Sequence, residues 1–309
     1  MDKAVVEITD PGRHLCVERG FMLVKEHGEL LGKVPLDDIS AVITNSYGVT
    51  FSNNIIMALA DRNIPMICCG KNHVPSAVVW SLYGNYRQAA CTDAQAEAPK
   101  ALNKRLWQMI IKNKILMQAR VLTFAGKNSD HLRQLSSYVK SGDTENHEAR
   151  AAKYYWNSLF GDDFRRDRDQ EGINSMLNYG YTVLRSLMAR AVMGAGLNPA
   201  LGIHHRNKLN PMRLVDDLME PFRPMVDMLI YHILMEETAE VNKSVKKALS
   251  TIHFLPIRQK SGGTTIGFSV RDTAVSIAKT YLKETDKPIL PESIPEHKYI
   301  SEHYKKCLE

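Results

Sequence analysis

Short hydrophobic segments alternate with polar turns over the first 90 residues of the chain. These segments are rich in β-branched residues and are separated by Gly, Pro, Asn or Asp, a pattern that is typical of strands. The predicted strands are residues 4–8, 14–17, 21–25, 41–44 and 66–69. One helix is predicted among them, at 53–60, because Ser52 is a favourable N-cap and apolar residues follow at helical spacing. We therefore expect a small β-rich domain over residues 1–90.

After residue 100 the hydrophobic period changes to that of helices. The predicted helices are residues 101–126, 129–140, 145–160, 171–195, 212–236, 239–250 and 269–284. Residues 91–100 are predicted to be a linker or the start of a solvated helix, because this stretch is rich in Ala, Gln and Asp and lacks aromatic residues. Residues 261–265 indicate a flexible loop, and the proline-containing residues 286–309 indicate an extended tail. The expected fold class is α+β, with a small β-rich N-terminal domain followed by a larger all-α C-terminal domain at 101–285.

The length of 309 residues exceeds what one hydrophobic core usually supports, which favours two domains. Hydrophobic residues make up 44% of the chain and charged residues 24%, and no segment approaches the roughly 20 apolar residues that cross a bilayer. Residues 1–10 lack the apolar core of a secretory signal, so we expect a cytoplasmic location. The five cysteines form no Cys-x-x-Cys pair, which favours reduced structural thiols.

Basic residues are concentrated in one predicted helix. The formal net charge is +6, and residues 100–127 contain seven Lys or Arg and no acid. At about 100° per residue, four of these cations share one helix face, opposite an apolar face: Arg105, Lys112, Arg120 and Lys127. Two interpretations stay open, a solvated helix face or a contact with the phosphate backbone of a nucleic acid. A second cluster, Arg165, Arg166 and Arg168, has two interpretations: it adds to this phosphate-binding surface, or it pairs with the neighbouring aspartates in a salt-bridged turn.

Two consecutive histidines, His204 and His205, stand at the start of a polar segment that covers residues 202–224. Consecutive side chains of a helix or a strand point apart, so at most one of these two imidazoles can reach a given centre. Either histidine alone is more often a hydrogen-bonded structural residue than a metal ligand. The His-Glu-x-x-His spacing of zinc hydrolases is absent from the segment.

Three acids follow the histidines. Asp216 and Asp217 lie three and four residues after Arg213, so we expect at least one of them to pair with this arginine. Glu220 has no such partner nearby in the sequence. It precedes Pro221, which biases Glu220 away from helical geometry and favours a break that places its carboxylate at the end of an element, where functional groups often lie.

A further carboxylate comes from residues 144–156. Thr144 is predicted to cap a helix whose first turn contains Glu145 and Glu148. Acids in a first turn stabilise the helix dipole, and Glu145 fits that role, whereas Glu148 is the better candidate to face inward. Carboxylates with one imidazole suit a hard ion, Mg²⁺ or Mn²⁺, better than structural zinc, and such an ion would serve phosphate chemistry.

Taken in order along the chain, these residues resemble the motifs of the CRISPR-associated integrase family, Cas1, over nearly the whole sequence. The family's glutamate at the start of an alanine-rich helix that ends in aromatics is matched by residues 148–156. Its Asn-x-x-Leu-x-Tyr-Gly-Tyr element is matched by residues 174–181. Gly202 and His205 match its Gly-x-x-His motif, and residues 217–224 match Asp-Leu-x-Glu-x-Phe-Arg-Pro. The motifs are most similar to those of type II CRISPR systems.

The resemblance implies a metal-dependent DNA endonuclease and integrase that joins the 3′-OH ends of spacer DNA to the CRISPR repeat by transesterification. By that resemblance, Glu148, His205 and Glu220 are the catalytic and metal-binding residues, and Mg²⁺ or Mn²⁺ is the cofactor. The family also works as homodimers on double-stranded DNA, with a small Cas2 subunit that bridges two dimers and with other Cas proteins of the same system. Many members have a single histidine where this chain has His204 and His205, and His205 keeps the Gly-x-x-His spacing.

On this interpretation, Arg105, Lys112 and Arg120 are expected to hold the DNA backbone, and Arg223 or Lys208 to stabilise a phosphate near the ion. Two other functions stay open. A branched-DNA repair nuclease would share the site but would not insert DNA. A DNA-binding scaffold would need the basic surface but no catalytic centre.

Overall fold

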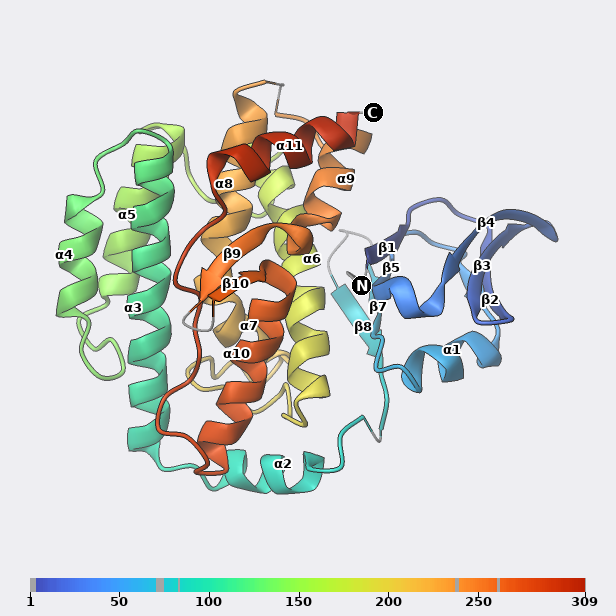
Figure 1. Cartoon of the computed structure of the whole chain (residues 1–309), viewed down its shortest axis with the longest axis horizontal. Coiled ribbons are helices and arrows are strands. Elements are labelled where there is room, and N and C mark those ends of the chain that lie inside the picture. The colour runs from blue at the N-terminus through green and yellow to red at the C-terminus, as the bar shows by residue number, and fades with distance from the viewer. Residues whose placement is uncertain (1–3, 71–74, 83, 237–238, 260–261, 309) are drawn as a thin grey trace.

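The computed structural model describes residues 4–70, 75–82, 84–236, 239–259 and 262–308, which form a β-rich part followed by a mainly helical part (Figure 1). The β-rich part contains one α-helix, α1 (Asn53–Ala60), the 3-10 turn η1 (Leu36–Asp38), and eight strands within these residues: β1 (Ala4–Ile8), β2 (Arg13–Glu18), β3 (Phe21–Glu26), β4 (Glu29–Pro35), β5 (Ile39–Thr44), β6 (Thr50–Phe51), β7 (Met66–Cys69) and β8 (Pro75–Val79). They form two sheets, in the orders β1-β5-β7-β8 and β4-β3-β2-β6. The structure confirms the five predicted strands and the predicted helix, and adds β4, β6 and β8.

The helical part is arranged around the long helix α3. Its elements are α2 (Gln88–Ala96), α3 (Lys100–Phe124), α4 (Asp130–Tyr138), α5 (His147–Phe160), α6 (Ile173–Gly194), α7 (Arg213–Met219), the 3-10 turn η2 (Glu220–Phe222), α8 (Arg223–Leu234), α9 (Lys243–Ser250), β9 (Pro256–Gln259), β10 (Gly262–Thr265), α10 (Ile266–Tyr281) and α11 (His297–Leu308). Helices α4 and α5 pack against α3, and so do α8 and η2. Figure 1 shows α3, α4 and α5 on the side of the molecule away from the sheets.

Strand β5 is buried along its whole length, and its two faces pack against different parts of the molecule. Val42 belongs to the hydrophobic core of the β-rich part. Ala41 and Ile43, which point to the other face of the strand, pack against Val183 and Leu187 of helix α6. The sheet therefore rests directly on the helical part, next to α6, as Figure 1 shows.

Helix α2 covers most of the predicted linker at 91–100, in agreement with the alternative that a helix starts there. This helix is polar, but Gln95 is buried and its Nε2 donates hydrogen bonds to the carbonyl oxygens of Asn198 and Leu201, at 3.2 and 3.3 Å. Cys91 of the same helix is buried in the core of the helical part. Helix α2 is therefore held in place by a few side chains that contact a loop distant in the sequence. The composition of residues 91–100 does not reveal these contacts.

The prediction of an all-α second part is wrong at one hairpin, in which Gly262–Thr265 pairs antiparallel with Pro256–Gln259. Of the predicted loop 261–265, residue 261 lies outside the described residues and the rest is strand β10. The predicted tail is also only partly right, because it ends in helix α11. Ile300, Tyr304 and Cys307 of α11 are buried, and their spacing is that of a helix.

None of the helices formed by the described residues combines the length and the apolar composition that crossing a bilayer requires. All five cysteines are free.

Candidate metal centre

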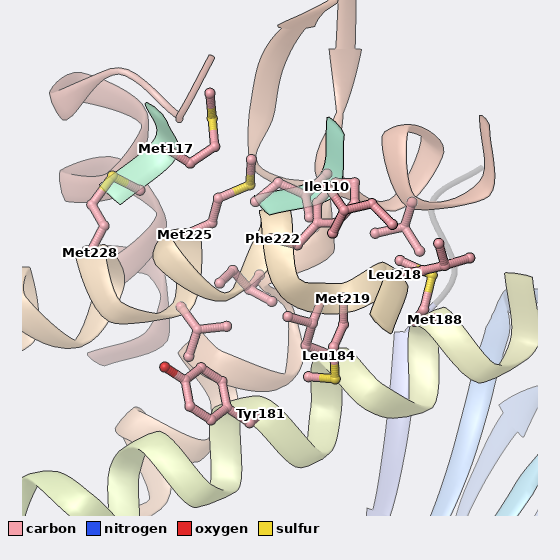
Figure 2. Close-up of a cluster of buried hydrophobic side chains, with 14 of the residues drawn as sticks. Ile110, Met117, Tyr181, Leu184, Met188, Leu218, Met219, Phe222, Met225 and Met228 are labelled. Carbon is pink, nitrogen blue, oxygen red and sulfur yellow. The ribbon is translucent and has the colours of Figure 1, made fainter. Parts of the chain in front are cut away.

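Glu220 is held by a short helical turn inside the core. The predicted helix 212–236 is interrupted, because α7 ends at Met219, η2 follows, and α8 begins at Arg223. Pro221 accounts for the break, since proline lacks the N–H that a continuous helix needs. Glu220 itself keeps helical dihedrals, with φ −52° and ψ −45°, so the predicted departure from helical geometry is wrong. Figure 2 shows Met219 and Phe222 directed into the cluster of buried side chains, so packing holds the turn on both sides of Glu220.

The Glu220 carboxylate is buried between two cations. Its Oε1 accepts a hydrogen bond from Arg223 Nε at 2.9 Å, and its Oε2 lies 2.5 Å from Lys114 Nζ. Burial would raise the pKa of Glu220, but the charges of Arg223 and Lys114 lower this pKa to about 2, so the carboxylate is ionised. The expectation that Glu220 has no partner nearby in the sequence is wrong, because Arg223 follows it by three residues.

Glu148 reaches the same lysine from the first turn of helix α5. Its Oε1 accepts a hydrogen bond from Lys114 Nζ at 2.6 Å. The helix begins through Asp143, whose buried carboxylate accepts hydrogen bonds from the backbone N–H groups of His147 and Glu148, at 2.9 and 3.0 Å. The predicted cap by Thr144 is therefore wrong, and Asp143 fixes the position from which Glu148 extends.

Asp217 anchors the loop that carries His205. Its fully buried carboxylate accepts hydrogen bonds from the backbone N–H groups of Ile203, His204 and His205, at 2.6, 3.0 and 3.3 Å. The Oδ1 atom of Asp217 also lies 2.5 Å from His205 Nδ1, and this hydrogen bond raises the pKa of His205. Because Nδ1 is engaged, Nε2 is the ring nitrogen of His205 that can bind an ion.

The two consecutive aspartates do not have the partner that the sequence predicts, Arg213. Asp216 Oδ1 accepts a hydrogen bond from Arg185 Nε at 2.8 Å, and its Oδ2 accepts one from Asn210 Nδ2 at 2.7 Å. Since Asn210 lies at the far end of the loop that carries His205, Asp216 and Asp217 together hold both ends of this loop. Among the described residues, no ion pair includes Arg213.

His204 and His205 lie in different surroundings. The ring of His204 stacks on Trp107 of α3, with ring centroids 4.2 Å apart and planes 3° from parallel. The ring of His205 meets Trp107 edge-on, and the negative charge of Glu220 contributes to its raised pKa. Of the two imidazoles, His205 is therefore the one whose ring is held by Asp217, whereas the ring of His204 is held by Trp107.

A divalent cation fits the donor atoms of this region, although the predicted ligands are brought together only in part. Glu148 and Glu220 converge on one positive charge, Lys114 Nζ, while His205 stays outside that contact. Within the ranges that the structure describes, no three His, Cys, Asp or Glu side chains are placed so that they could hold a metal ion. Carboxylate oxygens and an imidazole nitrogen are nevertheless donors that Mg²⁺ or Mn²⁺ accepts, and Glu220 Oε2 is buried without a well-directed hydrogen bond.

A pocket of about 230 Å³ opens beside Glu220 and is rich in cations. Its polar lining comes from α3, α5, α6, η2, α8 and the loop before α6: Lys114, Gln118, Trp156, Arg166, Arg168, Tyr181, Glu220, Arg223 and Asp227. Four cations against two acids give this surface an excess of positive charge. Such a pocket suits an anionic ligand, and phosphate is one that arginine binds well.

Arg166 shows that the predicted salt-bridged turn is wrong. Its guanidinium donates hydrogen bonds to Asn174 Oδ1 at 2.9 Å, to Asn178 Oδ1 at 2.6 Å and to the backbone carbonyl of Asp167 at 3.0 Å, and the described contacts include no aspartate carboxylate. Among the described residues, the ion pairs include neither Arg165 nor Arg168. The two asparagines belong to the first two turns of α6, so this helix holds Arg166 at the pocket.

Arg223 is oriented from the pocket side by a buried polar network. Its guanidinium lies over the ring of Tyr181, 4.7 Å from the centroid. The hydroxyls of Tyr181 and Tyr155 both donate hydrogen bonds to the Asp227 carboxylate. Burial raises the pKa of Asp227, and the two tyrosine hydrogen bonds and the charge of Arg223 lower it. Burial has the larger effect, and the resulting pKa is about 7. Asp227 therefore changes charge near neutrality, whereas Glu220 stays ionised.

The predicted basic face of α3 is accessible but lies away from Glu220. Arg105 and Arg120 are exposed and Lys112 is half-buried. Lys114 stands nine residues after Arg105, which places it about 180° around the helix from that face. Of the other predicted DNA contacts, Lys208 is exposed on the loop that follows His205. The structure therefore separates the basic face from the candidate metal centre by the width of α3.

Lys114 and Asp143 are residues of the centre that the sequence analysis did not identify. Lys114 falls on the apolar face of α3, with Leu106 and Ile110, where a lysine must find a buried partner. The position of a lysine on an apolar helix face could therefore have indicated from the sequence that Lys114 has a buried acidic partner. Asp143 offered no such indication, because it caps α5 from outside the predicted helix and through a loop in which Asn146 adopts a left-handed conformation, with φ 53°.

Two carboxylates, an imidazole and a cationic pocket are groups whose chemistry suits a divalent cation and a phosphate. The chain belongs to the family described as CRISPR associated protein Cas1, whose model matches residues 6–253. A CRISPR-associated endonuclease Cas1 from Neisseria meningitidis serogroup C (strain 8013) is 34% identical over 294 residues. The matched region covers 93% of this chain and 96% of that relative.

Solved structures share the fold. A casposase bound to its integration product superposes with a TM-score of 0.77 at 18% identity, and the match covers 92% of both chains. A Cas6-RT-Cas1–Cas2 complex gives a TM-score of 0.71 at 14% identity, covering 96% of this chain and 36% of the other. The arrangement of a β-rich part and a mainly helical part is therefore common to this chain and to these proteins.

Proposed function

We propose that the protein is a divalent-metal-dependent DNA integrase and endonuclease of CRISPR adaptation, which joins the 3′-OH ends of spacer DNA to the CRISPR repeat. The observation that carries this proposal is the convergence of Glu148 and Glu220, from separate elements, on one positive charge beside a cationic pocket. The similarity to an endonuclease of the same family, over nearly the whole of both chains, supports the choice of reaction.

Glu148, His205 and Glu220 are the proposed ligands of Mg²⁺ or Mn²⁺. When bound, such an ion polarises a DNA phosphodiester and lowers the pKa of the attacking hydroxyl. Asp217 keeps the His205 imidazole oriented through Nδ1, and Arg223 keeps Glu220 ionised. Attack by a 3′-OH exchanges one phosphodiester for another, so the reaction needs no nucleotide cofactor. Attack by water on the same phosphodiester gives the endonuclease reaction.

Alanine at His205 is expected to weaken Mn²⁺ binding by about tenfold or more, because a ligand that Asp217 orients is lost. His204→Ala is the matched control and is expected to change the affinity by less than about twofold, since its ring stacks on Trp107. Isothermal titration calorimetry of both variants measures the difference. Equal losses in the two variants would contradict the choice of His205.

The cationic pocket and the basic face of α3 have different proposed roles. The pocket, through Arg166, Arg168 and Arg223, is proposed to bind the phosphate next to the reacting bond, and its excess of positive charge supports this role. The basic face is placed to bind DNA backbone farther from the reaction, because it lies on the opposite side of α3 from Lys114. Lys208 extends the cationic surface on the loop that follows His205.

Joint replacement of Arg105, Lys112 and Arg120 by glutamine is expected to weaken DNA binding and to reduce its salt dependence. Each phosphate contact that is lost lowers the slope of log K against log salt concentration by about 0.9. Fluorescence anisotropy over a series of salt concentrations measures this slope, and joining at saturating DNA should be largely retained. An unchanged slope would show that this face is merely solvated.

Family membership supports the proposed partners: a second copy of the chain, double-stranded spacer and repeat DNA, a Cas2 subunit that bridges two dimers, and other Cas proteins of a type II system. One protein with the same fold is described as part of a complex with Cas2. We propose that the reaction takes place in the cytoplasm, where the DNA of the cell is accessible. Size-exclusion chromatography with and without the Cas2 protein from the same CRISPR locus tests the assembly.

An assay that supplies a spacer duplex together with a repeat-containing target distinguishes the integrase from the alternatives. The expected result is Mn²⁺-dependent covalent joining of spacer ends to the repeat boundary, abolished by a chelator. Cleavage of branched DNA without joining would indicate a repair nuclease. Binding without any reaction would indicate a scaffold.

A further inference from the structure

Lys114 occupies the point at which the two carboxylates of the centre meet. It comes from the middle of α3, and its side chain is 12% exposed. Its Nζ lies 2.6 Å from Glu148 Oε1 and 2.5 Å from Glu220 Oε2. Burial lowers the pKa of Lys114, but Glu220 and Glu148 outweigh this effect and the pKa is raised, so the side chain stays an ammonium ion.

This ammonium lies between the two carboxylates that are proposed as metal ligands. Two carboxylates so close together in a partly dry site repel each other unless a positive charge lies between them. Lys114 supplies one unit of charge there, and a divalent cation would supply two. Oxygen ligands stand about 2.1 Å from Mg²⁺, so an ion bound by Glu148 and Glu220 leaves no room for Nζ between them.

We propose that Lys114 is a built-in occupant of the metal site, which holds Glu148 and Glu220 in place in the metal-free protein and is displaced when the divalent cation binds. This inference rests on the proposed function, because it takes the two glutamates as metal ligands. It adds an internal competitor, a residue of the chain itself, to the binding equilibrium of the metal.

The displaced side chain has a place to go. Lys114 lines the cationic pocket of about 230 Å³, together with Arg166, Arg168 and Arg223. Moving the Lys114 ammonium toward these three arginines is unfavourable when the pocket is empty, because like charges repel. The same movement is favourable when a DNA phosphate is bound there, because the phosphate attracts the ammonium. Metal and phosphate therefore help each other to bind, and the coupling is reciprocal. The centre is loaded fully only when DNA is present.

The test measures Mn²⁺ binding to the full-length protein in the absence of DNA, by isothermal titration calorimetry. Lys114→Gln is expected to bind Mn²⁺ about tenfold tighter than the unchanged protein, because both the competitor and a repelling charge are removed. Lys114→Arg keeps the charge and is expected to bind no tighter than the unchanged protein. Lys153→Gln removes one exposed charge from α5 and serves as the control, with a change below about twofold.

Thermal unfolding gives a second measurement that does not depend on catalysis. Without metal, Lys114→Gln is expected to unfold at a lower temperature, because Glu148 and Glu220 lose their shared counterion. Saturating Mn²⁺ should restore this loss, so the metal-induced rise in unfolding temperature is larger than in the unchanged protein. A variant that folds only with Mn²⁺ would be the extreme form of this result.

Equal or weaker Mn²⁺ affinity of Lys114→Gln, with normal binding by the unchanged protein, overturns the displacement and leaves the proposed function intact. Failure of the unchanged protein to bind Mn²⁺ at all, with or without DNA, overturns the ligand assignment and with it this inference. The coupling is tested by titrating Ca²⁺ into the protein with and without spacer DNA. The expected affinity gain with DNA should shrink in Lys114→Gln, and an equal gain in both proteins overturns the coupling.

Discussion

Glutamine in place of Glu148 or Glu220 lowers the rate of strand joining by about a thousandfold or more, on the proposed mechanism. Each substitution keeps the shape of the side chain and removes one of the two negative charges that meet at Lys114. DNA binding should persist, since the cations of the pocket and of α3 are unchanged. Joining of a labelled spacer to a repeat target in Mn²⁺ measures the first effect, and fluorescence anisotropy measures the second.

Glu145→Gln is the matched control for this experiment. Glu145 lies near the start of the same helix, is exposed and pairs with Lys140, so its replacement should leave joining at the level of the unchanged protein. Metal-dependent joining that persists in both Glu148→Gln and Glu220→Gln would refute the assignment of these residues as ligands.

Asp217→Ala should cause the largest combined loss of stability and metal binding. The fully buried carboxylate accepts hydrogen bonds from three backbone N–H groups and contacts His205 Nδ1. Its removal leaves buried donors without partners, and we expect a loss of about 3–5 kcal/mol in the free energy of unfolding. Because the imidazole is no longer oriented, Mn²⁺ affinity should fall by about 10- to 100-fold. Urea unfolding and calorimetry measure the two effects.

His205→Ala separates the two consequences of the Asp217 substitution. It removes the imidazole but keeps the three backbone hydrogen bonds, so it should lose metal affinity with little loss of stability. If Asp217→Ala were as stable as His205→Ala, the loop would not depend on Asp217 for its position, and the anchoring role would be wrong.

The strands that sequence reasoning found and missed differ in how they are stabilised. Strand β5 was predictable because its β-branched residues are buried, and burial leaves a hydrophobic pattern in the sequence. Strand β4 was not, because it is largely exposed at the edge of its sheet, with Leu30 and Leu31 54% and 51% exposed. Its register comes from pairing with β3, and that pairing is a tertiary property.

The candidate site was predictable to the extent that its residues stand in short motifs. Glu148 and Glu220 could be named from the sequence, because each lies in a distinctive segment. The position of Lys114 on the apolar face of α3 indicates that this lysine has a buried partner. The identity of that partner and the role of Asp217 could not be inferred, since both depend on contacts between segments that are distant or irregular in the chain. Helical spacing predicts that Arg213 pairs with Asp217. In the structure, three backbone N–H groups of a loop donate hydrogen bonds to the Asp217 carboxylate instead.

Helix α3 presents Lys114 on one side and Arg105 with Arg120 on the other. A helix with its side chains is about 10 Å thick, so one straight duplex cannot touch both sides at once. If both surfaces bind DNA, they bind two segments, one that reacts and one that does not. An enzyme that inserts one DNA into another must hold two duplexes at a fixed distance and orientation. Helix α3, lying between the two duplexes, would be enough to set their separation.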